Sequence, residues 1–155
     1  MANALETLTL LAPPMPVRSL RDSARARSMR WARMCYDHIA GAVGVAVTEA
    51  LMARSGLREV DGGWTVGDAS AFAKLDLDVG ALPRRGRSLA RPCMDWSERR
   101  HHLAGSLGAA LTGEMVRRDW LRPREGSRIV TVTPAGSAGL RDWLGLDVEG
   151  LHPAA

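Results

Sequence analysis

The stretch Asp37-His-Ile-Ala-Gly-Ala-Val-Gly-Val-Ala-Val-Thr48 aligns without gaps on His101-His-Leu-Ala-Gly-Ser-Leu-Gly-Ala-Ala-Leu-Thr112. When the alignment is extended to residues 37–62 and 101–126, ten of the 26 positions are identical, which composition alone does not explain. A repeated unit buries its apolar face against its neighbour, so a repeat has to be recognised before a fold is assigned. We therefore predict that the chain is a tandem duplication of one helix, hairpin and helix unit.

Each copy is expected to begin with a helix, over residues 38–54 and 102–116. Apolar residues there fall at three- and four-residue steps, the spacing of one buried helical face. The two helices are expected to cross closely in the core, because small residues leave room for a second backbone; the alternative is a ligand lying against bare backbone. The small residues recur at four-residue steps and are Ala40, Gly44, Thr48, Ala104, Gly108 and Thr112.

A hairpin and a further short helix follow in each copy. The hairpins are expected over 57–66, where Asp61-Gly62-Gly63 is a tight-turn sequence, and over 121–133. Capping residues then predict short helices over 69–75 and 134–144. The predicted fold class is therefore α+β and mostly helical, built from two repeats that resemble the recognition helix, wing and final helix of a winged-helix domain.

These elements divide the chain into five segments. A helix that starts at Ser19 could run to Arg54, about 54 Å at 1.5 Å per residue, so it either breaks near residues 30–36 or packs on a second subunit. We expect a short helix and proline-rich lead over 1–18, a first winged-helix-like repeat with a long helix over 19–79, a basic connector over 80–92, a second repeat over 93–148 and a tail over 149–155.

Length and composition bound the class of protein. A chain of 155 residues with 46% hydrophobic residues is one domain or two very small ones, which excludes a large multidomain enzyme. No stretch approaches the roughly 18 apolar residues of a membrane span, and the first residues lack the basic region of a signal peptide, so we expect no membrane contact and a cytoplasmic protein. Cys35 and Cys93 do not make a disulfide framework, so free thiols are expected.

The charge distribution bears on nucleic acid. The net charge is +4 and the sequence pI is about 10, and the basic residues, all arginine except Lys74, cluster in 18–33, 84–100 and 117–128. The predicted helices offer few polar side chains for base edges, so we expect contacts with the DNA backbone at phosphates rather than base reading. Solvated arginine faces explain the same clusters. The predicted phosphate contacts are Arg122, Arg124 and Arg128, together with the connector arginines.

A Cys-x-Asp element precedes each repeat, Cys35-Tyr-Asp37 and Cys93-Met-Asp95. Cys35 and His38 are expected to share a helix face, and Cys93 with His101 or His102 could add ligands that thiophilic metals accept. No Cys-x-x-Cys pair is present, and three interpretations stay open: a metal or metalloid site, a thiol or acid–base catalytic site, or buried structural side chains. The catalytic interpretation uses Cys35, Asp37, His38, Cys93, Asp95 and Glu98.

Trp96 is an aromatic candidate for lining a small-molecule pocket, because it lies between a cysteine and two histidines, with Arg99 as an anion clamp. A capping aspartate or serine beside a packed tryptophan explains the same residues.

Residues 33–41, Arg-Met-Cys-Tyr-Asp-His-Ile-Ala-Gly, and residues 91–108, Arg-Pro-Cys-Met-Asp-Trp-Ser-Glu-Arg-Arg-His-His-Leu-Ala-Gly-Ser-Leu-Gly, resemble a known family. They are similar to the region that follows the DNA-binding domain in long bacterial transcriptional repressors of the arsenic-repressor (ArsR) type, and the likeness covers roughly residues 3–147. It implies a helical, dimerising and effector-sensing region. Family members carry an N-terminal winged helix, whereas this chain starts where that domain has ended, so DNA reading does not transfer. The Glu-Leu-Cys-x-Cys-type metalloid motif of the founding members is absent, so no metal role transfers either.

The sequence therefore predicts an effector-binding and dimerisation module of a bacterial transcriptional regulator, acting as a homodimer with a small-molecule effector. The alternative is a stand-alone small-molecule-binding protein or small enzyme that uses the region of Cys35, His38, Cys93 and Asp95. The sequence names no substrate, metal or cofactor. The predicted ligand-binding residues are Cys35, Asp37, His38, Cys93, Asp95, Trp96, Arg99 and His102.

Overall fold

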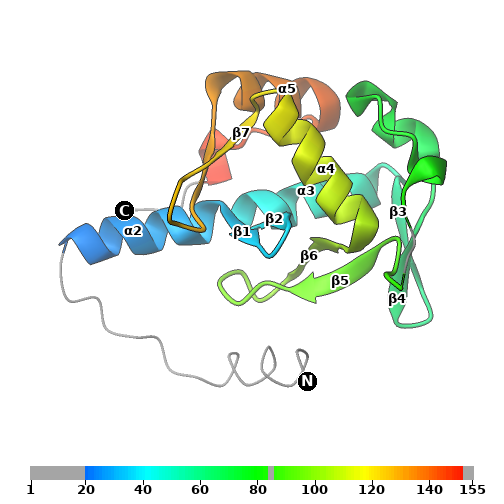
Figure 1. Ribbon diagram of the computed structural model, residues 1–155, viewed down its shortest axis with the longest axis horizontal. Helices are drawn as coiled ribbons and strands as arrows, with labels where there is room; N and C mark the ends of the chain where they lie inside the picture. The colour runs from blue at the N-terminus through cyan, green and yellow to red at the C-terminus, as the bar shows by residue number, and fades with distance from the viewer. Residues whose placement is uncertain (1–19, 84–85, 152–155) are drawn as a thin grey trace.

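The computed structural model describes residues 20–83 and 86–151, which form an α+β fold of helices and four antiparallel hairpins (Figure 1). The lead predicted over 1–18 and the end of the tail lie outside the described residues. Within the described part, no helix is both long enough and apolar enough to span a bilayer. The elements are α2 (Leu20–Trp31), β1 (Arg33–Cys35), β2 (His38–Ala40), α3 (Ala42–Ala53), β3 (Leu57–Val60), β4 (Gly63–Val66), η1 (Ala69–Leu75), η2 (Val79–Ala81), β5 (Arg91–Met94), β6 (His101–Ala104), α4 (Gly105–Arg117), β7 (Leu121–Pro123), β8 (Val130–Val132), α5 (Pro134–Leu144) and η3 (Glu149–Leu151).

The first residues of the helices predicted over 38–54 and 102–116 form strands instead. α2 ends at Trp31, so the long helix considered above does break, and residues 38–40 and 101–104 pair as strands of the hairpins β1–β2 and β5–β6. The prediction of helices from residues 38 and 102 was therefore wrong at their N-terminal ends. The cause lies at the strand–helix junctions, where Gly41 and Gly105 adopt φ values of +82° and +90°, a region that residues with side chains rarely enter.

The second hairpin and the following helix agree with the sequence in both halves. β3 pairs with β4 through a two-residue turn, and β7 pairs with β8. The Thr133 side chain accepts a hydrogen bond from the Gly136 amide and caps α5, which begins at Pro134 as predicted. Asp68 similarly accepts from the Ser70 amide at the start of η1, a 3-10 helix rather than an α-helix.

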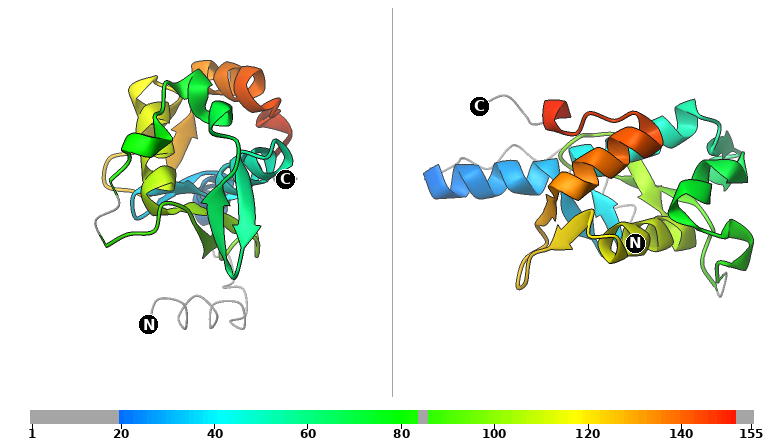
Figure 2. Two further views of the ribbon diagram at one scale, coloured as in Figure 1. Left: turned by 90° about the vertical axis from the view of Figure 1, so that its right-hand side faces the viewer. Right: turned by 90° about the horizontal axis from the view of Figure 1, so that it is seen from above.

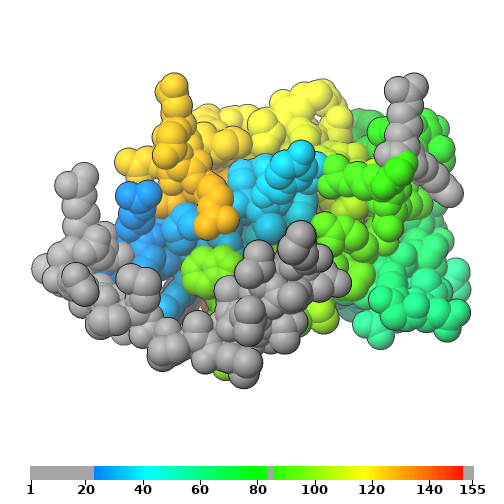
Figure 3. Space-filling view, turned by 60° about the horizontal axis from the view of Figure 1, so that its bottom comes forward, coloured from blue at the N-terminus to red at the C-terminus, as the bar shows by residue number. Residues whose placement is uncertain are grey.

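Each first hairpin adjoins the second hairpin of the other half of the chain. Arg33 of β1 bridges to Ile129 beside β8, and the Met34 amide donates to the Arg128 carbonyl at 2.7 Å. In the same way, Trp64 of β4 bridges to Ala90 beside β5. The space-filling view shows the cyan β1–β2 segment between the orange β7–β8 segment and green residues that precede β5 (Figure 3). The two halves are thus interleaved, with α2 at one end of the molecule and β3–β4 at the other (Figure 2).

Reciprocal hydrogen bonds hold each helix against the hairpin of the other half. The Thr48 hydroxyl of α3 accepts from the Leu103 amide of β6 at 2.8 Å, and the Thr112 hydroxyl of α4 accepts from the Ile39 amide of β2 at 2.8 Å. Both hydroxyls donate to the carbonyl four residues earlier in their own helix. Thr48 and Thr112 are aligned partners of the sequence repeat, so the same hydrogen bond is made twice, once in each direction.

The small residues of α3 and α4 allow each helix to lie close to strand backbone. A Cβ atom added at Gly44 would meet the Ile39 carbonyl, and one added at Gly108 would meet the Leu103 carbonyl. The next residues that these atoms would meet are His102 and His38 of the opposite half. The expected close crossing of the two helices is therefore replaced by a close approach of each helix to a hairpin. The predicted burial is confirmed, since Val43, Val47 and Leu51 of α3 and their counterparts in α4 belong to one core.

Candidate metal centre

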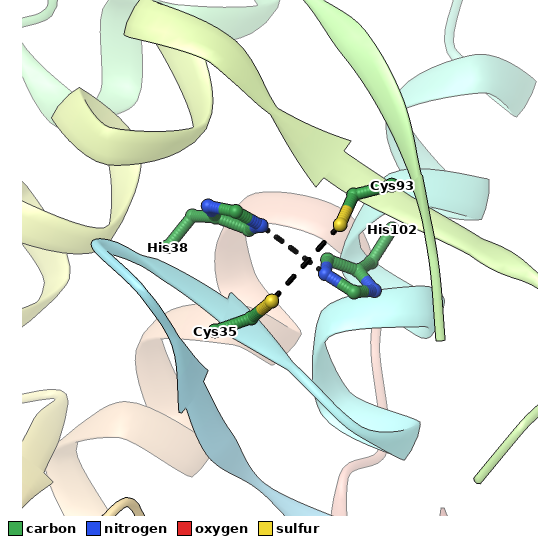
Figure 4. A group of neighbouring side chains, drawn as sticks. All are labelled: Cys35, His38, Cys93 and His102. Atoms are coloured by element: carbon green, nitrogen blue, oxygen red, sulfur yellow. Dashed lines mark hydrogen bonds between the residues drawn. The ribbon is translucent and has the colours of Figure 1, made fainter. Parts of the chain in front are cut away.

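Four side chains with metal-ligating atoms converge where the hairpins β1–β2 and β5–β6 meet. Cys35, His38, Cys93 and His102 come from β1, β2, β5 and β6, and one ligand atom of each lies within 4.8 Å of all the others (Figure 4). The Cys35 and Cys93 sulfurs are 4.0 Å apart, and the Nε2 atoms of the two histidines are 3.2 Å apart. Cys35 is half-buried, and the other three are buried.

The strand register explains how the four residues meet. Cys35 lies directly opposite His38 in the first hairpin, and Cys93 lies directly opposite His102 in the second. The expectation that Cys35 and His38 share a helix face was therefore wrong in its geometry, although the two residues do come together. The second half has six more residues between its cysteine and its histidine than the first, and they lie in the turn between β5 and β6 without changing the paired positions.

Asp37 and Arg87 hold the first histidine. The Nδ1 atom of His38 lies 3.1 Å from Asp37 Oδ1, and Arg87 donates two hydrogen bonds to the same carboxylate, at 2.6 and 2.9 Å. The bidentate guanidinium, assisted by His38, lowers the pKa of Asp37 to about 2. An ionised carboxylate only accepts hydrogen bonds, so His38 presents an N–H at Nδ1 to Asp37 and turns Nε2 toward the cluster.

Asp95 has the corresponding position beside the second histidine and is fully buried. Its Oδ1 accepts from Arg33 at 2.8 Å and from the Ser97 amide at 2.9 Å, and its Oδ2 accepts from the Gly41 amide at 2.7 Å. His102 Nδ1 lies 3.3 Å from Oδ2, at ion-pair distance but without the alignment of a hydrogen bond. Burial works to raise the pKa of Asp95, but the contacts with His102, Arg33 and Gly41 outweigh it and hold the pKa far below the ordinary value.

The same surroundings favour a thiolate. Hydrogen bonds from Cys93, His102 and His38 outweigh burial and lower the pKa of Cys35 to about 2. Burial lowers the pKa of His102, but Asp95 and Cys35 outweigh it and raise that pKa above its ordinary value. The cluster therefore combines two sulfur atoms, one of them a thiolate, with two imidazole rings, and sulfur and imidazole nitrogen are the donor types that tetrahedral metal sites use.

Several predicted ligand-binding residues lie outside this group of four. His101 is exposed and places its ring edge-on to Trp64, so of the two adjacent histidines only His102 enters the cluster. Trp96 and Arg99 are exposed residues of the turn between β5 and β6, and the Trp96 ring lies under the Arg33 guanidinium at 4.4 Å. Glu98 accepts from Ser97 in the same turn.

Two residues that organise the site were not predicted from the sequence. Arg33 and Arg87 were predicted only as members of the arginine clusters. Arg33 is 1% exposed and forms an ion pair with Asp95, and Arg87 of the connector forms an ion pair with Asp37. A sequence signal existed for Arg33, because it directly precedes the Met-Cys-x-Asp element, whereas nothing local marks Arg87 among its neighbours. The arginines predicted to contact phosphates, Arg122, Arg124 and Arg128, are exposed on the β7–β8 hairpin, where Arg122 pairs with Asp119.

One known relative of this chain is named as a transcriptional regulator. The chain is 36% identical over 149 residues to the uncharacterized HTH-type transcriptional regulator YdfF of Bacillus subtilis (strain 168), a match that covers 95% of this chain and 66% of that protein. The chain thus spans slightly less than two thirds of the relative. No protein-family model matches the chain, and no solved structure matches it.

Proposed function

We propose that this chain is the effector-binding and dimerisation module of a bacterial transcriptional regulator of the arsenic-repressor type, with Cys35, His38, Cys93 and His102 as its ligand site. The similarity to an HTH-type regulator over nearly the whole chain supports the regulatory role. The observation that carries the effector role is the convergence of these four side chains, three of them buried, at the joint between the two halves, beside the buried ion pair Arg33–Asp95 and the partly exposed pair Arg87–Asp37.

Burying such groups rarely stabilises a protein as well as apolar packing of the same volume. A site that keeps them serves something other than stability. Because the donors come in equal numbers from both halves, a ligand at this point contacts β1–β2 and β5–β6 together. Its binding therefore favours one relative placement of the two hairpins, which is the differential contact that allosteric coupling needs. The two halves are, on this proposal, tandem copies of one winged-helix-like unit, as their reciprocal contacts support.

The regulatory role is tested by chromatin immunoprecipitation of the tagged chain, expressed from its own locus in its own host. Enrichment at a discrete set of promoters is expected. Cys35→Ser should change that occupancy because it alters the ligand site, whereas His101→Gln, an exposed histidine on the same hairpin, should leave it as in the wild type. No discrete enrichment of the wild-type chain would refute the regulatory role. Enrichment that Cys35→Ser leaves unchanged would refute the effector role alone.

Direct DNA contact is proposed at the phosphate backbone, through Arg122, Arg124 and Arg128. Fluorescence anisotropy with two unrelated duplexes should give equal affinities that fall steeply with salt. Replacing Arg124 and Arg128 by glutamine should reduce the salt slope by about one for each phosphate that is no longer neutralised. Affinity independent of salt would exclude this contribution. Sedimentation equilibrium of the wild-type chain tests the homodimer, and a monomer mass at all concentrations would refute it.

A second candidate, a small thiol enzyme or stand-alone small-molecule-binding protein, is favoured by one observation. The Cys35 thiolate lies in the same cluster as His38, which in turn contacts Asp37, an order of groups that activates cysteine nucleophiles. Rapid alkylation of Cys35 at mildly acid pH, together with turnover of a metabolite retained on purification, would support this candidate over the regulatory module.

A further inference from the structure

We propose that Cys35, His38, Cys93 and His102 bind one divalent thiophilic cation of the zinc type in tetrahedral coordination, and so join the two halves of the chain. This inference deepens the proposed function, since it names the ligand of the same site.

The spacing of the donor atoms matches a tetrahedron. Ligand atoms of a regular tetrahedral site are separated by about 1.6 times the metal–ligand distance, which gives about 3.8 Å between two zinc-bound sulfurs and about 3.3 Å between two zinc-bound nitrogens. The corresponding distances here are 4.0 Å between the Cys35 and Cys93 sulfurs and 3.2 Å between the His38 and His102 Nε2 atoms. In Figure 4 the line joining the sulfurs crosses the line joining the nitrogens, as opposite edges of a tetrahedron do in projection.

The orientation of the histidines is that of metal ligands. Both rings turn Nε2 toward the cluster and Nδ1 toward a carboxylate, Asp37 for His38 and Asp95 for His102. A carboxylate behind the ring fixes the tautomer in which Nε2 carries a lone pair, and it makes that nitrogen more basic. Two such lone pairs facing each other at 3.2 Å repel unless a cation or a proton lies between them. Carboxylate, histidine and metal in this order are a recurrent arrangement of zinc sites.

Charge balance favours a divalent ion over a monovalent one. The buried carboxylate of Asp95 is balanced by Arg33, and that of Asp37 is balanced by Arg87. The remaining charges are those of the two cysteine thiolates, which a single divalent cation neutralises. A monovalent copper ion would leave a net negative charge in a largely buried site, which is costly.

Four protein donors also fill the coordination sphere. Catalytic zinc sites keep one position open for water or substrate, whereas sites with four protein ligands are structural or regulatory. The cation therefore acts on the arrangement of the hairpins. Its removal leaves four donors to be accommodated by protonation, so the joint between β1–β2 and β5–β6 is the part of the fold that responds to metal.

The test uses the full chain, purified without metal and under reductant, with Co²⁺ as the spectroscopic probe and Zn²⁺ as the competitor. We expect Co²⁺ to bind with one equivalent per chain and to give the intense visible bands of tetrahedral coordination together with a thiolate-to-cobalt charge-transfer band. Zn²⁺ should abolish both. Cys35→Ser should remove roughly half of the charge-transfer intensity, since it scales with the number of thiolates bound. His101→Gln is the matched control and should bind as the wild type does.

Two further measurements keep the test decisive if a variant unfolds. Asp37→Asn, which leaves all four ligands in place, should weaken Zn²⁺ binding about 10- to 100-fold. X-ray absorption of the zinc-loaded wild type should show two sulfur ligands at about 2.3 Å and two nitrogen ligands at about 2.0–2.1 Å. Octahedral Co²⁺ spectra from the folded wild type, or tetrahedral spectra that survive Cys35→Ser unchanged, would overturn the metal site.

The outcomes separate this inference from the proposed function. If the zinc test fails but promoter occupancy still depends on Cys35, the chain is a regulator with another ligand and the metal site is refuted. If zinc binds as described but the wild type shows no promoter enrichment, the metal site stands and the regulatory role is refuted.

Discussion

Gly108 and Gly113 lie in the same helix, α4, yet alanine should have opposite effects at the two positions. A Cβ atom at Gly108 would lie 2.5 Å from the Leu103 carbonyl oxygen, whereas a Cβ at Gly113 would have nothing within 4 Å. Ordinary contacts of this kind begin at 3.4 Å, so at Gly108 the helix and β6 must separate by nearly 1 Å. The obstructing atom belongs to buried backbone and cannot rotate away.

The magnitudes follow from these distances. Alanine in place of an exposed helical glycine gains about 0.8–1 kcal/mol, so Gly113→Ala should stabilise the protein by that amount. At Gly108 the same gain is opposed by overpacking, which typically lowers the unfolding free energy by about 1–3 kcal/mol. We expect the upper end of this range because the obstructing atom belongs to the backbone. Gly108→Ala should therefore destabilise the protein by about 2 kcal/mol, a difference of about 3 kcal/mol between the two variants.

Urea unfolding of the chelator-treated chain, followed by circular dichroism, measures both variants against the wild type. The midpoints should move in opposite directions with an unchanged slope. Gly44→Ala repeats the experiment in the other half, because a Cβ there would lie 2.6 Å from the Ile39 carbonyl oxygen. If Gly108→Ala stabilises the protein as much as Gly113→Ala does, the close approach of α4 to β6 is incorrect.

Three further predictions concern the joint between the halves. Thr48→Val and Thr112→Val each leave a buried strand amide without its acceptor, so each should cost about 1–3 kcal/mol in urea unfolding; Thr131→Val, at an exposed strand position, is the control, and an equal effect there would contradict the reasoning. Asp95→Asn should lower the unfolding free energy by about 3–5 kcal/mol, because it leaves the Arg33 side chain, which is 2% exposed, without its counter-charge. A change smaller than that of Thr131→Val would disprove the buried ion pair. Free Zn²⁺ at about 100 times its dissociation constant should add about 2.7 kcal/mol to the unfolding free energy of the wild type. The gain should be absent in Cys35→Ser, and its persistence there would speak against Cys35 as a ligand.

Local sequence signals predicted much of the secondary structure. Two such signals are the turn residues between β3 and β4 and the Thr133-Pro134 start of α5. Their effect is confined to neighbouring residues, so it can be predicted without knowledge of the fold. The hairpin strand His38–Ala40 was not readable in this way. Three apolar or half-apolar residues before an apolar helix continue its periodicity, and only the positive φ of Gly41 separates the two elements.

The candidate site was predicted in its residue types and only in part in its geometry. Cys35, His38 and Cys93 were marked by their position at the start of each repeat, and His102 was the histidine predicted to bind the ligand, with His101 beside it left as an alternative metal ligand. The alternation of side chains along β6 decides between them, since it sends His102 inward and leaves His101 exposed.

The sequence by itself determined that one pattern occurs twice, that its helices are buried, and that cysteine, aspartate and histidine stand at the start of each copy. The tertiary structure alone decided that the two halves of the chain interleave and that Arg33 and Arg87 pair with the carboxylates beside the two histidines. The physical reason is the separation along the chain of the residues that interact. Helix periodicity, caps and turns depend on neighbours along the chain, whereas the meeting of Cys35 with Cys93, 58 residues apart, depends on how two hairpins pack around a shared core.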